Sequence, residues 1–375
     1  MYFDDIAGQE AIKRRLTAMA DEGRIAHALL FAGAEGTGAL PLAIAFAQYI
    51  NCTGSRSGGK ACGQCPSCVK YDRLVHPDLH FVFPIITSGP ESKCDDDLKA
   101  WRQQLAEQPY FGLKQWTERL GGSKAAVIPV TAAQAVMEKL SLKTYEARYK
   151  VMIIWLPEKM NDSASNKLLK ILEEPPAGTV FILVSEQTYG ILPTILSRTQ
   201  ALRIPAIDDE AMAAELAARH HMEPDAARRT AHVAQGNMVK AIELATGGGT
   251  ADEYLELFMR LMRTCYTRKV PDIIALSDDL ARLSRDGLRN WLTYCLHMLR
   301  ENFVAGLGES RISYMTDAEA AFSERFAAFV HIGNVEEMAR EINLAIAQTE
   351  QNGNARIITT DLMLKLTVLL LAPRP

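Results

Sequence analysis

The chain has 375 residues, more than one hydrophobic core usually organises, so two or three domains are expected. Its hydrophobic content of 48% and charged content of 23% are ordinary for a soluble globular protein. A formal net charge of −4 argues against strong independent binding to nucleic acid. No apolar run reaches the length of a membrane span, and the acidic start does not look like a signal peptide, so we expect a cytoplasmic protein without a membrane partner.

The spacing of apolar residues predicts an α/β layer followed by helices alone. The expected elements are, in chain order, a helix over 9–20, a strand over 27–32, a helix over 41–49, a strand over 79–83, a helix from a capping box at Thr131 through Leu140, a strand over 151–155, a helix over 164–172 and a strand over 180–184. Strands that alternate with helices predict an open parallel sheet flanked by helices. From Asp208 onward the patterns are helical, and the glycines at 247–249 are typical of a linker.

The turn after the first strand has the glycine spacing of a phosphate-binding loop. Gly33 and Gly38 frame it, with Gly36 between them, and a helix follows. Backbone N–H groups in this arrangement cradle phosphates. A working loop continues with a Lys for the phosphates and a Ser or Thr for Mg²⁺, but here Ala39 and Leu40 follow. We therefore expect a vestigial loop without a functional ATP site.

A second set of polar groups that ATP hydrolysis needs is missing after the 151–155 strand. An ATPase would place there an Asp for Mg²⁺ and a Glu that orients water, whereas this chain has Trp155 and Leu156. Glu158 comes a few residues too late, and we expect a solvated residue at a helix start. Lys240, further along, either faces a nucleotide or is simply solvated. Because both the glycine-rich turn and the end of this strand lack these polar groups, we expect that the chain is not itself an enzyme.

Four cysteines crowd into a Gly/Ser-rich segment. They are Cys52, Cys62, Cys65 and Cys68. Cysteines two residues apart can face one tetrahedral Zn²⁺, and four thiolates close its coordination shell, so the segment predicts a structural zinc module over 52–68. Four free thiols are the plainer alternative. His76 and His80 are nearby alternative ligands, although core or surface positions are the expected ones for both.

Two further features stand out in this part of the chain. Arg198 follows a helical stretch over 191–197, where an arginine can neutralise a helix C-terminus or pair with a carboxylate. A polar stretch over 86–127 interrupts the α/β pattern and carries two helical faces with Trp101 and Trp116. We expect these faces to cover the body of the domain, and a docking surface is the alternative.

The order of these features resembles the bacterial DNA polymerase III clamp-loader subunits of the AAA+ class, and within them the delta prime group. The residues that carry the resemblance are Phe3–Glu10, His27–Gly33, the four-cysteine module, His76–Asp78, the Ser-Asn-Lys-Leu-Leu-Lys-Ile-Leu-Glu-Glu-Pro-Pro block at 165–176, and Leu196–Thr199. The resemblance spans roughly 1–205 and is only architectural beyond. The chain departs from the family pattern at Thr199, where the family has Cys, and in the length of the 86–127 insertion.

The resemblance implies a non-ATPase subunit of a five-subunit loader that places a sliding clamp on primer-template DNA. The implied partners are the gamma or tau ATPase subunits and the delta subunit, and Arg198 would serve as an arginine finger for a neighbouring ATPase. The implied domains are an AAA+ α/β domain over 1–205 with the zinc module and the insertion, a helical lid over 206–247, and a helical C-terminal collar over 250–375.

Two other function classes stay open on the residues. The first is an active gamma/tau-type or other AAA+ ATPase. The retained glycines favour it, and the apolar residues Ala39, Leu40, Trp155 and Leu156 oppose it. A zinc-dependent nucleic-acid-binding protein is the other alternative. Its cysteine module would have only Arg56 and Lys60 as cations between the outer cysteines, too few for a strong phosphate footprint.

Overall fold

The computed structural model describes residues 1–56, 58–87, 89, 91–122, 125–141, 144–246, 250–309 and 312–373. The chain divides into two units, Met1–Ala245 and Thr246–Pro375. The glycines at 247–249, expected to form a linker, lie outside the described residues.

The first unit is built on a five-stranded parallel sheet. Its strands are β1 (Ala28–Ala32), β2 (Leu79–Val82), β3 (Lys150–Trp155), β4 (Thr179–Ser185) and β5 (Gln200–Arg203). Their order across the sheet is β2-β3-β4-β1-β5, so β1 lies between two strands that come much later in the chain. The expected open parallel sheet is confirmed.

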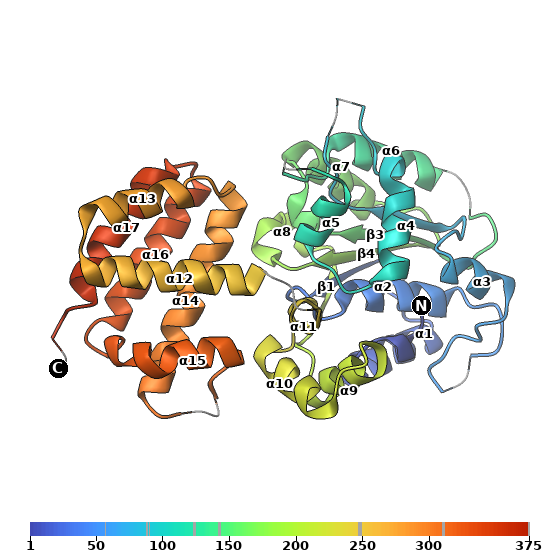
Figure 1. The fold of residues 1–375 in the computed structure, drawn as a ribbon. Helices are drawn as coiled ribbons and strands as arrows, with labels where there is room; N and C mark the ends of the chain where they lie inside the picture. Colours follow the sequence, from blue (N-terminus) through green and yellow to red (C-terminus); the bar gives the residue numbers. More distant parts are fainter. Residues whose placement is uncertain are drawn as a thin grey trace. The chain divides into compact units, whose positions relative to one another are not determined.

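Helices lie on both sides of this sheet (Figure 1). They are α1 (Glu10–Asp21), α2 (Ala39–Ile50), α3 (Pro66–Asp72), α4 (Leu98–Glu107), α5 (Leu113–Arg119), α6 (Val130–Ser141), α7 (Asp162–Glu173) and α8 (Pro193–Leu196), with the short 3-10 turns Phe3–Asp5, Cys94–Asp97, Pro157–Lys159 and Thr188–Gly190. One expected boundary is wrong. Thr131 lies inside α6, not at its cap, and its hydroxyl donates to the Ser92 carbonyl.

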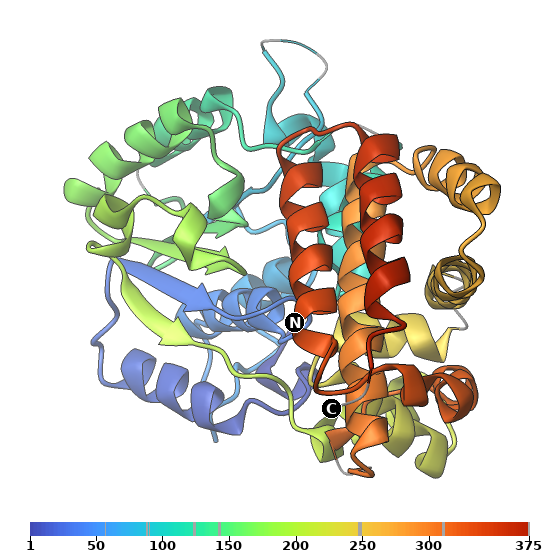
Figure 2. The ribbon, with the colours of Figure 1, turned by 90° about the vertical axis from the view of Figure 1, so that its left-hand side faces the viewer.

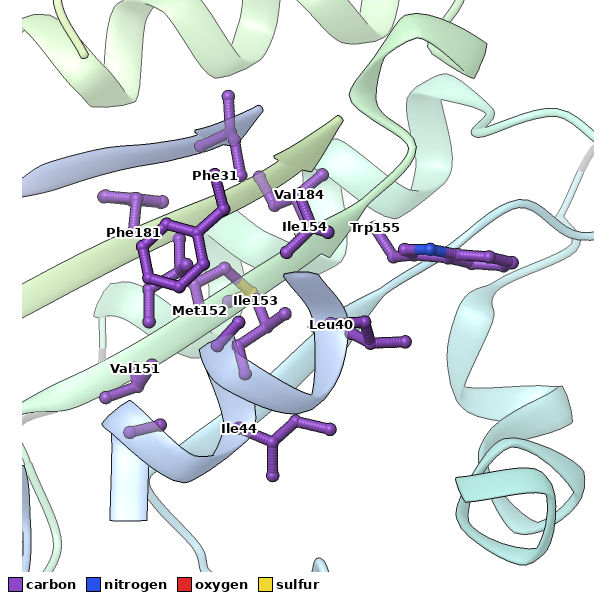
Figure 3. Packing of buried hydrophobic residues seen from close by; sticks show 14 of the residues in the cluster. Phe31, Leu40, Ile44, Val151, Met152, Ile153, Ile154, Trp155, Phe181 and Val184 are labelled. Carbon is purple, nitrogen blue, oxygen red and sulfur yellow. The ribbon is translucent and has the colours of Figure 1, made fainter. Parts of the chain in front are cut away.

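The central strands have continuous apolar sequences because both faces of the sheet are covered. Every residue of β3 and β4 is buried. Figure 3 shows how Phe31, Met152 and Phe181 pack in this core together with α2. A sheet covered in this way holds its strand ends, and the loops that follow them, in fixed positions.

Three alanine-rich helices complete the first unit. They are α9 (Asp209–Arg219), α10 (Pro224–Ala234) and α11 (Met238–Ala245). Asp208 caps α9 and Glu223 caps α10 through hydrogen bonds from backbone N–H groups. The three helices share a small core of their own, and three residues outside these helices, Ala7, Tyr110 and Ile207, belong to it.

The second unit consists of helices and the loops that join them, with no strand among its described residues. Its helices are α12 (Thr250–Thr267), α13 (Val270–Leu280), α14 (Arg285–Gly306), α15 (Asp317–Phe326), α16 (Val335–Glu350) and α17 (Ala355–Leu369), with a 3-10 turn over Ala327–Phe329. Figure 2 shows α16 and α17 lying side by side. Trp291 and Phe258 are fully buried in the core of this bundle.

Candidate functional site

The glycine-rich turn between β1 and α2 keeps the backbone of a phosphate-binding loop. Gly36 and Gly38 have positive φ angles of 76° and 84°, a conformation that costs glycine little. Gly38 is the N-cap of α2. The Thr37 hydroxyl donates to the Ala34 carbonyl at 2.8 Å and so closes the turn on itself. The turn therefore presents its backbone at the N-terminus of a helix, as a phosphate site requires.

The two residues after the turn point into the protein. Ala39 and Leu40 are only 7% and 5% exposed. Leu40 and Trp155 line the same residual cavity of about 30 Å³ over the turn, and Figure 3 shows Leu40 beside α2 and Trp155 at the end of β3. Trp155 and Leu156 are buried as well. Buried apolar and aromatic side chains thus occupy these positions beside the turn.

The 86–127 insertion closes this region from outside. Between α4 and α5, the chain places Tyr110 and Phe111 over the turn, and both are buried. The Phe111 ring lies 5.1 Å from the Trp155 ring, centroid to centroid. Sequence reasoning did not find this contact. The topology of the sheet could have indicated it, because loops that follow parallel strands gather at the same edge of the sheet as the glycine-rich turn.

The interpretation of the tryptophans in the insertion is confirmed. Trp101 and Trp116 are fully buried. Trp101 stacks on Phe83 at 4.3 Å, and the Trp116 indole N–H donates to the Pro84 carbonyl at 2.7 Å. The two helical faces cover the sheet, and their aromatic rings hold the segment with Tyr110 in place.

The start of α11 also contacts the turn. The backbone N–H of Met238 donates to the Gly36 carbonyl at 3.1 Å. A Cβ added at Gly36 would collide with the Asn237 side chain, so only glycine fits beneath it. The Lys240 ammonium, which the sequence left either facing a nucleotide or solvated, donates to the Val233 carbonyl at 2.8 Å.

Three carboxylates lie around the turn and the end of β4. Glu158 lies in the first turn of the 3-10 helix Pro157–Lys159, as expected, but it is only partly exposed and accepts hydrogen bonds from the backbone N–H groups of Glu186 at 2.9 Å and Gln187 at 3.1 Å. Burial, followed by the charges of Glu35 and Glu158, raises the pKa of Glu186 to about 8. Burial also raises the pKa of Glu35.

The four cysteines form one cluster. Their Sγ atoms all lie within 4.8 Å of one another, and those of Cys62 and Cys68 are 3.9 Å apart. A tetrahedral ion with bonds of about 2.3 Å holds its sulfurs about 3.8 Å apart, so the cluster could hold a metal ion. Although burial opposes it, hydrogen bonds from Thr53 and from the backbone N–H of Cys68 lower the pKa of Cys65 to about 5. A lowered pKa favours the thiolate, the form that binds metal, whereas burial raises the pKa of Cys68 in the same cluster.

Neither candidate histidine belongs to the cluster. His76 is buried, and its Nδ1 accepts the backbone N–H of Asp78 at 3.1 Å. His80 is half-buried on β2. Both therefore occupy the structural positions expected of them.

Arg198 follows α8 at the surface of the first unit. One guanidinium nitrogen, Nη2, pairs with Glu173 Oε1 at 2.9 Å, and Nη1 donates to the Thr194 carbonyl at 3.0 Å. Arg198 thus makes both contacts expected from the sequence: it pairs with a carboxylate, and it binds a carbonyl at the C-terminal end of a helix. The side chain remains 37% exposed, so its guanidinium is accessible from outside.

The parallel sheet, the glycine-rich turn after β1 and the three-helix segment closing over that turn define an AAA+-like α/β protein. The family model described as DNA polymerase III, delta subunit, matches residues 8–208, more than half of the chain. The chain therefore belongs to the DNA polymerase III delta prime subunit family.

Individual relatives agree with this assignment. The chain is 28% identical over 261 residues to DNA polymerase III subunit delta' of Bacillus subtilis, covering 70% of this chain and 66% of that protein. It is 26% identical to subunit gamma/tau of Mycobacterium tuberculosis, covering 74% of this chain and 42% of the relative. The match thus spans about two thirds of the first relative's length and less than half of the second's.

Among solved structures, a DNA polymerase III gamma subunit-related protein of Thermotoga maritima aligns over 96% of this chain and 99% of its own. The TM-score is 0.42 at 14% identity.

No described helix of the chain is both long and apolar enough to cross a bilayer.

Proposed function

We propose that this chain is a subunit of a clamp loader that does not hydrolyse ATP itself. One observation carries the proposal: the turn keeps its glycine frame, while Ala39 and Leu40 are buried in the space where a nucleotide would need polar groups. The residual cavity of about 30 Å³ is far smaller than the roughly 300–1,000 Å³ of small-molecule sites.

Arg198 is the residue that we propose to act in catalysis, in a neighbouring subunit's ATP site. An arginine supplied in trans stabilises the charge that develops during phosphoryl transfer and contributes roughly 10³ to 10⁵ in rate. Arg198 suits this role because it is partly exposed and contacts a surface carboxylate, a carbonyl and a hydroxyl. The gamma/tau relatives point to the kind of subunit that would receive it.

The clamp-loader role also suggests how the domains, the partners and the metal site of this chain are used. We propose a three-part division into an α/β domain over 1–205, a lid over 206–247 and a collar over 250–375 through which the loader subunits assemble. The partners would be gamma/tau and delta subunits, with the sliding clamp and primer-template DNA engaged by the assembled complex inside the cytoplasm. Zn²⁺ in the cysteine cluster would be structural, because four thiolates leave no open coordination position.

The proposal is tested by mixing the purified chain with gamma/tau and delta subunits. We expect a stable complex on size exclusion, and no saturable binding of labelled ATP by this chain alone in equilibrium dialysis. The gamma/tau subunit, dialysed in parallel, is the positive control. Binding of one ATP per chain would contradict the non-ATPase role, and failure to assemble would contradict the loader role.

A further inference from the structure

We propose that the insertion is an internal plug: Tyr110 and Phe111 fill the space over the glycine-rich turn, and Tyr110 joins the three-helix segment to the α/β part where a nucleotide would otherwise lie between them. The proposal rests on the nucleotide-free turn proposed above. It does not depend on Arg198 or on assembly with other subunits.

Tyr110 has contacts to all three parts that meet at the turn. A Cβ on Gly38 would lie 3.2 Å from Tyr110 Cε1, so the ring packs directly on the glycine-rich backbone. The Tyr110 hydroxyl accepts the backbone N–H of Ala7 at 2.9 Å, and both groups are buried. Its ring also belongs to the core of α9, α10 and α11. A single side chain therefore provides apolar area and a hydrogen-bond acceptor at the junction.

The neighbouring segment strengthens this contact. Phe111 packs on Trp155, and Gly112 lies so close to Glu35 that a Cβ there would collide with the carboxylate. Gln115 accepts the Gly112 N–H at 2.9 Å, and its amide donates to Glu243 on α11 at 2.6 Å. The insertion thus contacts the turn and the three-helix segment at several points.

Tyr110 also lines two cavities. The small one over the turn is about 30 Å³, and the other is a groove of about 490 Å³, lined by Arg102, Glu215 and Met238 among others. Tyr110, Pro109 and Pro41 line both spaces. Truncating Tyr110 would therefore join them into a space in the size range of nucleotide sites.

The first test measures whether the plug holds the three-helix segment. In the full chain, Tyr110→Ala should raise hydrogen-exchange rates of α9–α11 amides about ten-fold or more, while β3 and β4 stay protected. The matched control is Tyr145→Ala, because Tyr145 is 80% exposed. Should Tyr110→Ala not fold, Tyr110→Phe takes its place. This variant removes only the acceptor of the Ala7 N–H, and it should raise the exchange rates of the same amides several-fold. Exchange within two-fold of the native chain in the folded variants would overturn the proposal.

The second test measures whether the plug occupies the nucleotide's place. Ala39→Lys with Leu40→Thr restores the missing polar groups, and binding of a fluorescent ATP analogue is compared with and without Tyr110→Ala. The plug predicts an apparent affinity at least about ten-fold higher when Tyr110 is truncated. Equal binding with the plug intact would overturn this inference and leave the proposed function standing. Binding by the native chain would instead contradict the proposed function.

Discussion

Arg198 Nη2 lies 2.9 Å from Glu173 Oε1, so the arginine that follows α8 pairs with the last residue of α7. The two side chains are 37% and 43% exposed. Exposed ion pairs contribute only about 0 to 1 kcal/mol to stability, because water screens the charges. Arg198 can therefore leave Glu173 for another anion at little cost, as a role in a neighbouring site requires.

The weakness of this pair is testable by itself. Glu173→Gln should change the free energy of unfolding of the full chain by less than about 1 kcal/mol in urea denaturation. A loss above about 2 kcal/mol would mean that the pair is structural, and that Arg198 is not readily released.

The cysteine cluster predicts one bound Zn²⁺ per chain, measured by mass spectrometry of the metal content after purification without chelator. Cys65→Ser should remove the metal and lower the thermal stability of the first unit, because three thiolates hold Zn²⁺ less firmly than four.

Cys94→Ala is the matched control, since Cys94 is buried outside the cluster and its thiol donates to the Phe83 carbonyl. It should keep one Zn²⁺ per chain. A native chain that is fully folded without metal, with all four thiols reactive, would refute the zinc module.

The contact between Gly36 and Asn237 predicts a large effect of one methyl group. Gly36→Ala should destabilise the chain by about 2 kcal/mol more than Gly23→Ala does. Gly23 has a similar positive φ, 68° against 76°, but a Cβ there meets nothing within 4 Å. The pair of variants therefore separates backbone strain from the collision, and equal losses in urea denaturation would show that α11 does not close on the turn.

Glu186 predicts a pH dependence of stability. Its pKa of about 8 in the folded chain lies above its value of 4.5 in the unfolded chain, so the unfolded state loses its proton first as the pH rises. Stability therefore falls between about pH 4.5 and pH 8 and is level above that range. Glu186→Gln should remove this fall, a gain of about 2 kcal/mol at pH 8 after allowance for partial exposure.

The measurement is urea unfolding of both proteins at several pH values. The exposed Glu174→Gln serves as control and should keep the native profile. If the difference between native and Glu186→Gln does not grow with pH, then Glu186 is ionised in the folded chain.

The sheet was predictable because its buried strands leave a strong local signal. Runs such as Val151–Trp155 are apolar at every position, and the glycines at 33, 36 and 38 define the turn without any knowledge of distant residues. The cysteine cluster was predictable from spacing for the same reason. Each of these signals lies within a short stretch of chain.

The contacts that close the turn were not predictable in this way. Tyr110 is about 70 residues from Gly38, and Asn237 about 200 from Gly36, so neither leaves a periodic trace near its partner. The sequence indicated that Glu158 starts a helix but not its hydrogen bonds, because its partners, at 186 and 187, follow another strand. Such pairs depend on how the sheet brings its loops together.

The central claim is that this chain serves a neighbour's ATP site through Arg198. Single-turnover ATP hydrolysis by the reconstituted complex, with clamp and primer-template DNA, tests it most directly. Arg198→Ala should assemble normally and slow hydrolysis at the served site by roughly 10³-fold, whereas Arg203→Ala on exposed β5 should leave it unchanged. Unchanged hydrolysis in an intact Arg198→Ala complex would contradict the account.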